Sequence, residues 1–239
     1  MSFYRERPGS GAVRCWWEQR VGATSMVQRV VPDGCSDVLV FADGEAVFAG
    51  PALCADLVPL TAGTHVRGLR FRTEALGPVL RLPAEELRDK TLTLSAVLPD
   101  RVMRTVAEQV WAGRFPDVLR PSPIDARVRH GVRELFVTGA AVGDVADELG
   151  VTERHLRRLF LDHTGMSPKA VQRVGRFQRF LHAADTSRAG LAELAAATGF
   201  ADQAHLTREV RSLAGLTPGA LRRERSGMQP PGSGLDGLR

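Results

Sequence analysis

One segment occurs twice in the C-terminal half of the chain, and this repeat limits the fold more than any other feature. Residues 145–168 read VADELGVTERHLRRLFLDHTGMSP, and residues 194–218 read LAAATGFADQAHLTREVRSLAGLTP. Such internal similarity indicates a duplicated supersecondary unit. The matched pairs keep an offset of 49 before the turn and of 50 after it: Ala146–Ala195, Gly150–Gly199, Leu156–Leu206, Gly165–Gly215 and Pro168–Pro218.

The first copy has the residues that a helix-turn-helix unit needs. Ala146 is small where two helices cross closely, and Gly150 can adopt the left-handed backbone that ends the first helix. Thr152 is placed to cap the second helix. The exposed face of that second helix is expected to carry three candidate DNA-binding residues: Arg154, Arg157 and Arg158.

The second copy repeats this arrangement with different surface residues. Asp202 is the expected cap of its second helix. The side chains expected on the exposed face include types that read base edges or hold phosphates in the major groove. They are Gln203, Ala204, Thr207 and Arg208.

The segment between the copies, residues 169–184, has apolar residues at helical spacing and carries cations but no acids. It predicts a helix that joins the two units rigidly. We expect Arg173 and Arg176 on this helix to contact DNA phosphates. The alternative is a charged face that is merely solvated.

The charge balance agrees with a polyanionic partner. The formal net charge is +5, and residues 124–225 hold 16 Arg and Lys against 12 Asp and Glu, whereas residues 1–123 hold 15 against 14. The basic excess therefore lies mostly in the C-terminal half. Net charge alone does not separate nucleic acid from a membrane surface.

On these motifs, residues 124–225 resemble the AraC/XylS family of bacterial transcription regulators. The resemblance rests on Gly199-Phe200 with Asp202, on the Gly215–Pro218 motif and on Arg222. It implies sequence-specific binding of double-stranded DNA and transcription regulation, with two recognition helices in successive major grooves roughly 34 Å apart. Selectivity would come from the exposed arginines of both units, namely Arg154, Arg157 and Arg208.

The chain departs from the family where aromatic residues are usual. Aliphatic residues stand at four such positions, which predicts a smaller core in the second unit. They are Val171, Leu206, Val210 and Leu221.

The N-terminal half predicts short strands over 13–21, 26–31, 36–42, 45–50, 57–60 and 65–71, followed by helical patterning from Thr73 and over 101–113. Asp43-Gly44 indicates a hairpin with a type I′ turn. The fold class expected is α+β, with a β-rich, barrel-like domain before an all-α domain that contains two helix-turn-helix units and their linker helix.

Prolines 121 and 123 place a junction between two domains, because two prolines so close cannot lie inside one helix. We expect a sensor or dimerisation domain over 1–119 and a DNA-binding domain over 124–225. The Gly/Pro/Ser-rich tail over 226–239 is expected to be disordered.

The N-terminal half resembles, less specifically, the sensor or dimerisation domains of such regulators. This resemblance implies modulation by a small molecule or by a protein partner and, as further candidate partners, RNA polymerase and a second copy of the chain. The candidate effector-binding residues are Trp16, Trp17, His65 and Arg70. No cofactor is expected.

Three cysteines allow two alternatives. Cys15, Cys35 and Cys54 with His65 could bind a metal, but their wide spacing lacks the close pairs typical of zinc sites, so no metal is expected. Cys35 could act as a redox sensor or nucleophile in an enzymatic module, but Asp33 and Asp37 flank it and disfavour the thiolate.

Other classes of protein are less consistent with the sequence. It contains no Gly-x-Ser-x-Gly, phosphate-loop or His-Glu-x-x-His motif, so we expect no enzyme. No apolar run is long enough to span a bilayer and no signal peptide is evident, so we expect a cytoplasmic protein without membrane contact. A protein-interaction module that uses basic helices without DNA specificity stays open.

Overall fold

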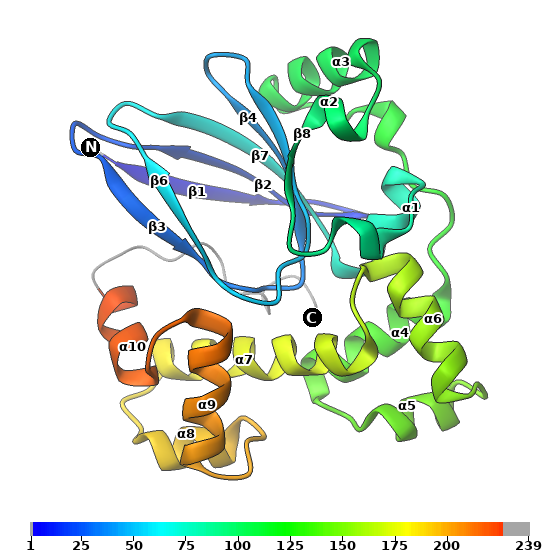
Figure 1. Ribbon diagram of the computed structural model, residues 1–239, viewed down its shortest axis with the longest axis vertical. Helices are drawn as coiled ribbons and strands as arrows, with labels where there is room; N and C mark the ends of the chain where they lie inside the picture. Colours follow the sequence, from blue (N-terminus) through cyan, green and yellow to red (C-terminus); the bar gives the residue numbers. More distant parts are fainter. Residues whose placement is uncertain (1, 227–239) are drawn as a thin grey trace.

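The computed structural model describes residues 2–226 and places a β-rich N-terminal half beside a helical C-terminal half (Figure 1). The strands are β1 (Phe3–Pro8), β2 (Val13–Arg20), β3 (Met26–Val30), β4 (Ser36–Phe41), β5 (Ala46–Ala49), β6 (Asp56–Leu60), β7 (His65–Phe71) and β8 (Thr91–Thr93). The helices of the N-terminal half are α1 (Leu76–Leu80), α2 (Leu94–Val97) and α3 (Asp100–Trp111), with short 3-10 turns at Thr73–Ala75, Ala84–Leu87 and Asp117–Leu119.

The C-terminal half is helical throughout. Its helices are α4 (Ala126–Arg133), α5 (Val142–Glu148), α6 (Glu153–Thr164), α7 (Pro168–Thr186), α8 (Leu191–Ala197), α9 (Gln203–Ala214) and α10 (Pro218–Ser226), with a π-helical turn at Glu134–Thr138. The linker helix expected over 169–184 is α7. Apart from Ser226, which ends α10, the tail expected to be disordered lies outside the described residues.

Six strands pair antiparallel in the order β1-β2-β7-β4-β5-β8. β1 and β8 form the two edges of this sheet, so it is open, and the expectation of a barrel-like domain is wrong. β3 and β6 pair only with each other in a separate two-stranded ribbon. The spacing of strands along the sequence predicts their number and length. Whether the sheet closes into a barrel depends on pairing between distant strands, which the spacing does not predict.

The two faces of the six-stranded sheet have different roles, because side chains alternate across each strand. On one face, Val38, Phe48 and Leu69 are fully buried in the main N-terminal core, into which α1, α2 and α3 also pack. The opposite face carries Trp17 and Leu39 and looks toward the ribbon β3–β6. We call this second side the ribbon-facing side of the sheet.

In the C-terminal half, α5 packs on α6, α8 packs on α9, and α7 contacts both pairs. Each pair has its own apolar core. The four aliphatic residues that replace family aromatics are at most 1% exposed, and Val171 packs in the first core rather than the second. The first core includes Val145, Leu156 and Phe160, and the second includes Leu206, Val210 and Phe180 of α7.

The halves touch along α6 and α1. A Cβ atom on Gly77 would lie 2.1 Å from the carbonyl oxygen of Asp162, so only glycine permits this approach. Arg88 donates a hydrogen bond of 3.2 Å to the carbonyl of Gly165, at the C-terminal end of α6. Figure 1 shows this end of α6 against α1. The docking leaves the N-terminal end of α6 away from the sheet.

The expected hairpin forms, but its turn differs from the type I′ expectation. A type I′ turn requires a positive φ at both of its central residues. Gly44 has a φ of +93°, but Asp43 is not among the residues with positive φ. The Phe41 amide donates to the carbonyl of Glu45 across a three-residue loop, and the Asp43 carboxylate accepts from the Glu45 amide. The loop is therefore one residue longer than a two-residue hairpin connection.

Candidate nucleic-acid interface

The first helix pair, α5–α6, is built around a four-residue turn. Gly150 in that turn has a φ of +64°, a left-handed backbone that glycine adopts without strain. The Thr152 hydroxyl accepts a hydrogen bond of 3.2 Å from the His155 amide and caps α6, as predicted. The turn and cap thus fix the angle at which α6 leaves α5.

Burial divides α6 into two sides. Leu156 and Phe160 are fully buried in the first core, which locks the back of the helix. The three predicted arginines on its other side are exposed, and Arg158 contacts the His155 ring at 3.2 Å. The exposed side is therefore a cationic surface on a rigid helix, and it consists of Arg154, Arg157 and Arg158.

The second helix pair, α8–α9, repeats the geometry. Gly199 has a φ of +84°, and the Asp202 carboxylate accepts a hydrogen bond of 2.6 Å from the His205 amide at the start of α9. Of the predicted surface residues, Gln203, Ala204 and Arg208 are exposed, while Thr207 is half-buried and donates to the carbonyl of Gln203.

The duplication continues past both helices. Gly165 and Gly215 end α6 and α9 with φ values of +71° and +72°. The hydroxyls of Ser167 and Thr217 then accept hydrogen bonds of 3.2 Å from amides three residues later, and a proline begins the next helix in each case. The sequence repeat is therefore a repeat of backbone geometry.

The arginines of α7 are engaged within the protein. Arg173 donates to the Glu209 carboxylate at 2.7 Å and to the Ser212 hydroxyl at 2.7 Å, which ties α7 to α9. The Arg176 guanidinium lies over the Phe200 ring, 5.2 Å from its centroid. These contacts give both residues a role inside the C-terminal half, and their contact with phosphate stays a prediction.

Sequence reasoning missed Arg179 on the same helix. Its guanidinium donates to the main-chain carbonyl of Phe136, and burial lowers the pKa of the side chain. This contact holds α7 against the π-helical turn. The signal available in the sequence was the cation spacing on this helix, which does not distinguish a surface cation from one that binds a carbonyl.

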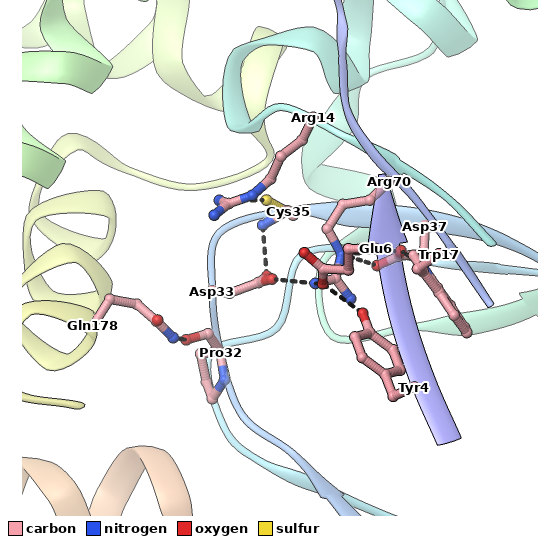
Figure 2. A network of polar contacts seen from close by, with 10 residues as sticks. All are labelled: Tyr4, Glu6, Arg14, Trp17, Pro32, Asp33, Cys35, Asp37, Arg70 and Gln178. Atoms are coloured by element: carbon pink, nitrogen blue, oxygen red, sulfur yellow. Dashed lines mark hydrogen bonds and ion pairs between the residues drawn. The ribbon is translucent and has the colours of Figure 1, made fainter. Parts of the chain in front are cut away.

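Two of the candidate effector-binding residues, Trp17 and Arg70, lie together on the ribbon-facing side of the sheet. The Trp17 indole donates to the Asp37 carboxylate at 2.6 Å, and Arg70 binds the same carboxylate at 3.1 Å. Arg70 also pairs with Asp33 at 3.2 Å (Figure 2). Burial raises the pKa of Asp37, although the adjacent Arg70 opposes this shift.

The other two candidates, Trp16 and His65, point to the opposite side of the sheet. Trp16 packs against the main N-terminal core. The His65 ring contacts Glu18 at 2.7 Å and lies 4.8 Å from the ring of Trp111 in α3. The structure therefore separates the four candidates into two pairs.

The cysteine proposed from the sequence as a redox sensor or nucleophile is Cys35. Cys35 is buried, and its sulfur lies 3.4 Å from the Arg14 guanidinium. Burial, together with the charge of Asp33, raises the pKa of Cys35 to about 12, so the thiol stays protonated at neutral pH. Among the described residues, no group of three or more His, Cys, Asp or Glu side chains is arranged to hold a metal ion.

No helix within residues 2–226 combines the length and apolar character that crossing a membrane requires.

Two family models match the chain, one in each half. A family described as a helix-turn-helix domain matches residues 145–224, and a domain of unknown function, DUF6597, matches residues 10–93. The HTH-type transcriptional regulator GlxA of Rhizobium meliloti (strain 1021) is 40% identical over 78 residues, which are 33% of this chain and 24% of that protein. The chain thus matches about a quarter of the length of this curated relative.

Solved structures give weaker similarity. The C-terminal domain of AraT, a response regulator from Geobacillus stearothermophilus, has a TM-score of 0.39 at 23% identity, covering 44% of this chain and 87% of that one. ToxT from Vibrio cholerae has a TM-score of 0.45 at 10% identity, covering 95% of this chain and 98% of that one. These scores are too low to transfer any property to this chain.

The structural and sequence comparisons agree. The capped helix pair α5–α6 recurs as α8–α9, the matched family is a helix-turn-helix domain, and the relative is an HTH-type transcriptional regulator. Residues 145–224 of this chain are a helix-turn-helix DNA-binding domain of the AraC type.

Proposed function

We propose that the chain is a sequence-specific transcription regulator that binds double-stranded DNA through α5–α6 and α8–α9 as two helix-turn-helix units. One observation carries the proposal: α6 and α9 each bury an apolar back and expose polar or cationic side chains near a capped N-terminus. A recognition helix enters the major groove with that part of its surface.

The spacing of the units fits a duplex. α7 has 19 residues and is therefore about 28 Å long. Successive major grooves on one face of DNA lie roughly 34 Å apart, so one chain can present α6 and α9 to two neighbouring grooves. Arg154 and Arg157 would read bases in one groove and Arg208 in the other.

The arginines of α7 fit a supporting role better than a direct one. A phosphate contact by Arg173 would compete with Glu209, and one by Arg176 would compete with stacking on Phe200. We propose that both residues chiefly fix α9 on α7. The salt dependence of DNA binding distinguishes this role from phosphate contact.

We further propose that residues 1–119 form a regulatory domain and residues 124–225 the DNA-binding domain, and that a small molecule acts through the first. RNA polymerase and a second copy of the chain are proposed partners, and the cytoplasm is the proposed location. We propose no catalytic step, because the buried Cys35 thiol, the residue of the enzymatic alternative, stays protonated.

Selection of bound sequences from a random DNA pool with the purified protein tests the function. We expect one preferred, asymmetric site whose binding survives excess competitor DNA. Arg157→Ala should weaken binding to that site more than binding to random DNA, by about 1–3 kcal/mol. Enrichment of no sequence would contradict the proposal and favour an interaction module without DNA specificity.

A further inference from the structure

A cavity of about 660 Å³ lies between the ribbon β3–β6 and the ribbon-facing side of the sheet. Its volume falls within the range of small-molecule sites, about 300–1,000 Å³. A hydrogen bond of 2.6 Å from Gln19 of β2 to Gln28 of β3 bridges the sheet and the ribbon at its border. The ribbon therefore forms one wall of the cavity, and the sheet forms the other.

Most of the wall is apolar. Leu39 and Val66 contribute from the sheet, and Val58 and Leu60 from the ribbon. Burying apolar ligand surface against these side chains is favourable in proportion to the area removed from water. The body of a ligand that fills the cavity is therefore apolar.

The polar part of the wall carries an excess of acids. Arg70 lines the cavity and pairs with three carboxylates, Asp37 at 3.1 Å, Asp33 at 3.2 Å and Glu6 at 3.9 Å, of which Asp37 is itself a lining residue (Figure 2). The charged side chains that line the cavity are Asp37, Asp56 and Asp89 against Arg70 and Lys90, so three negative charges meet two positive ones. An anionic ligand would add to that excess, whereas a cationic one would balance it.

Two further features favour a cation. The rings of Tyr4 and Trp17 line the cavity and stack with centroids 5.9 Å apart, and aromatic faces attract cations. The Asp37 carboxylate accepts hydrogen bonds from Trp17 and Arg70, and a carboxylate has about four acceptor positions. A donor on the ligand can therefore bind Asp37 without displacing either partner.

Strand β3 connects the cavity to the second helix pair, because its side chains alternate. Gln28 and Val30 line the cavity. Arg29 between them points outward and donates to the carbonyl of Ala214 at 2.9 Å and to the Glu224 carboxylate at 2.9 Å. A displacement of β3 by a ligand therefore acts directly on the end of α9 and on α10.

We infer that this cavity is the effector site, that its ligand is a small amphipathic amine whose ammonium group binds Asp37, and that β3 transmits occupancy to α9 and α10 through Arg29. The transmission step rests on the proposed function in DNA binding. The binding step does not.

Three probes of eight carbons test the ligand class: octylamine, octanoate and octanol. We expect calorimetry and thermal shift on the full chain to show octylamine binding at least about tenfold more tightly than octanoate, the difference made by one charge-assisted hydrogen bond. Equal or tighter binding of octanoate, or binding of none of the three probes, would overturn the inference.

Paired substitutions locate the binding. Val58→Trp fills the cavity from the ribbon, while Val27→Trp places the same side chain on the outer side of the ribbon, where Val27 is 60% exposed. Octylamine binding should be lost in the first variant and kept in the second. Binding that persists in Val58→Trp would place the ligand elsewhere and overturn the site.

The transmission step is tested by measuring affinity for the DNA site selected from the random pool, with and without octylamine. Saturating octylamine should change the DNA affinity of the unmodified chain at least about threefold, and Arg29→Ala should still bind octylamine but show no such change. An equal change in Arg29→Ala, or no change in either protein, would overturn transmission through Arg29. A failure to select any DNA site would instead overturn the proposed function and leave the probe results standing.

Discussion

The side-chain amide of Gln178 on α7 donates a hydrogen bond of 2.6 Å to the main-chain carbonyl of Pro32, 146 residues earlier in the chain (Figure 2). Gln178 is 2% exposed, so this bond lies in the contact between the two halves. The next residue, Asp33, binds Arg70 beside the cavity. The β3–β4 connection therefore touches both the polar cluster and the linker helix.

Gln178→Leu should destabilise the chain, because it leaves the buried carbonyl of Pro32 without this donor. The expected loss is about 1–3 kcal/mol in the free energy of unfolding, measured by urea denaturation. Hydrogen exchange should also accelerate in residues 31–35. Gln203→Leu, on the exposed side of α9, is the control and should leave both quantities unchanged. Equal effects of the two substitutions would argue against a structural role for the bond to Pro32.

Arg176→Ala should weaken DNA binding without changing its salt dependence. The guanidinium lies over Phe200 in the turn before α9, so its removal loosens this turn on α7 but takes away no phosphate contact. Binding measured over a series of salt concentrations gives the slope. A decrease of about one unit would show instead that Arg176 contacts a phosphate.

Gly77→Ala should disturb the contact between α1 and α6. The added Cβ would lie 2.1 Å from the carbonyl oxygen of Asp162, and main-chain atoms cannot yield easily. Overpacking of this kind costs about 1–3 kcal/mol, which lowers the midpoint of thermal unfolding. Gly143→Ala in α5 is the matched control, since its Cβ would be 3.4 Å from the end of the Glu153 side chain. A midpoint equally low in both variants would contradict the steric cause.

Glu18 should contribute to stability at neutral pH and lose that contribution in acid. Burial raises the pKa of Glu18, but hydrogen bonds from His65, Arg5 and Arg67 outweigh it and lower the value to about 2. A carboxyl whose pKa is lower when folded stabilises above its unfolded value of 4.5, and this stabilisation disappears as the pH falls toward about 2.

Glu18→Gln tests this pH dependence. The variant should be less stable than the unmodified chain at pH 7, and the gap should narrow across that acid range when unfolding is followed by circular dichroism. A gap that stays constant down to pH 2 would mean that ionisation of Glu18 does not contribute.

Much of the fold could be predicted from local sequence patterns. The caps Thr152 and Asp202 and the turn glycines act on neighbouring residues, so the sequence alone predicted where α6 and α9 begin. The strand over residues 13–21 was found from its apolar and aromatic residues. β1 was missed, because FYRERP at a sheet edge is largely exposed and has no apolar alternation.

Features that depend on contacts between distant residues could not be predicted from the sequence. Trp16 and Trp17 are neighbours on one strand and must face opposite sides, but the pattern did not show which side borders the cavity. The internal partners of Arg173, which lie on α9, depend on how the helices pack. The open sheet and the separate ribbon depend likewise on pairing between distant strands.

Hydroxyl-radical footprinting on the selected DNA site tests the two-unit reading of the duplex most directly. Two protected stretches should lie on one face of the DNA, about 10 base pairs apart. Arg157→Ala should weaken protection mainly in one stretch and Arg208→Ala mainly in the other. A single protected stretch, or the same loss from both substitutions, would contradict the account that α6 and α9 enter separate grooves.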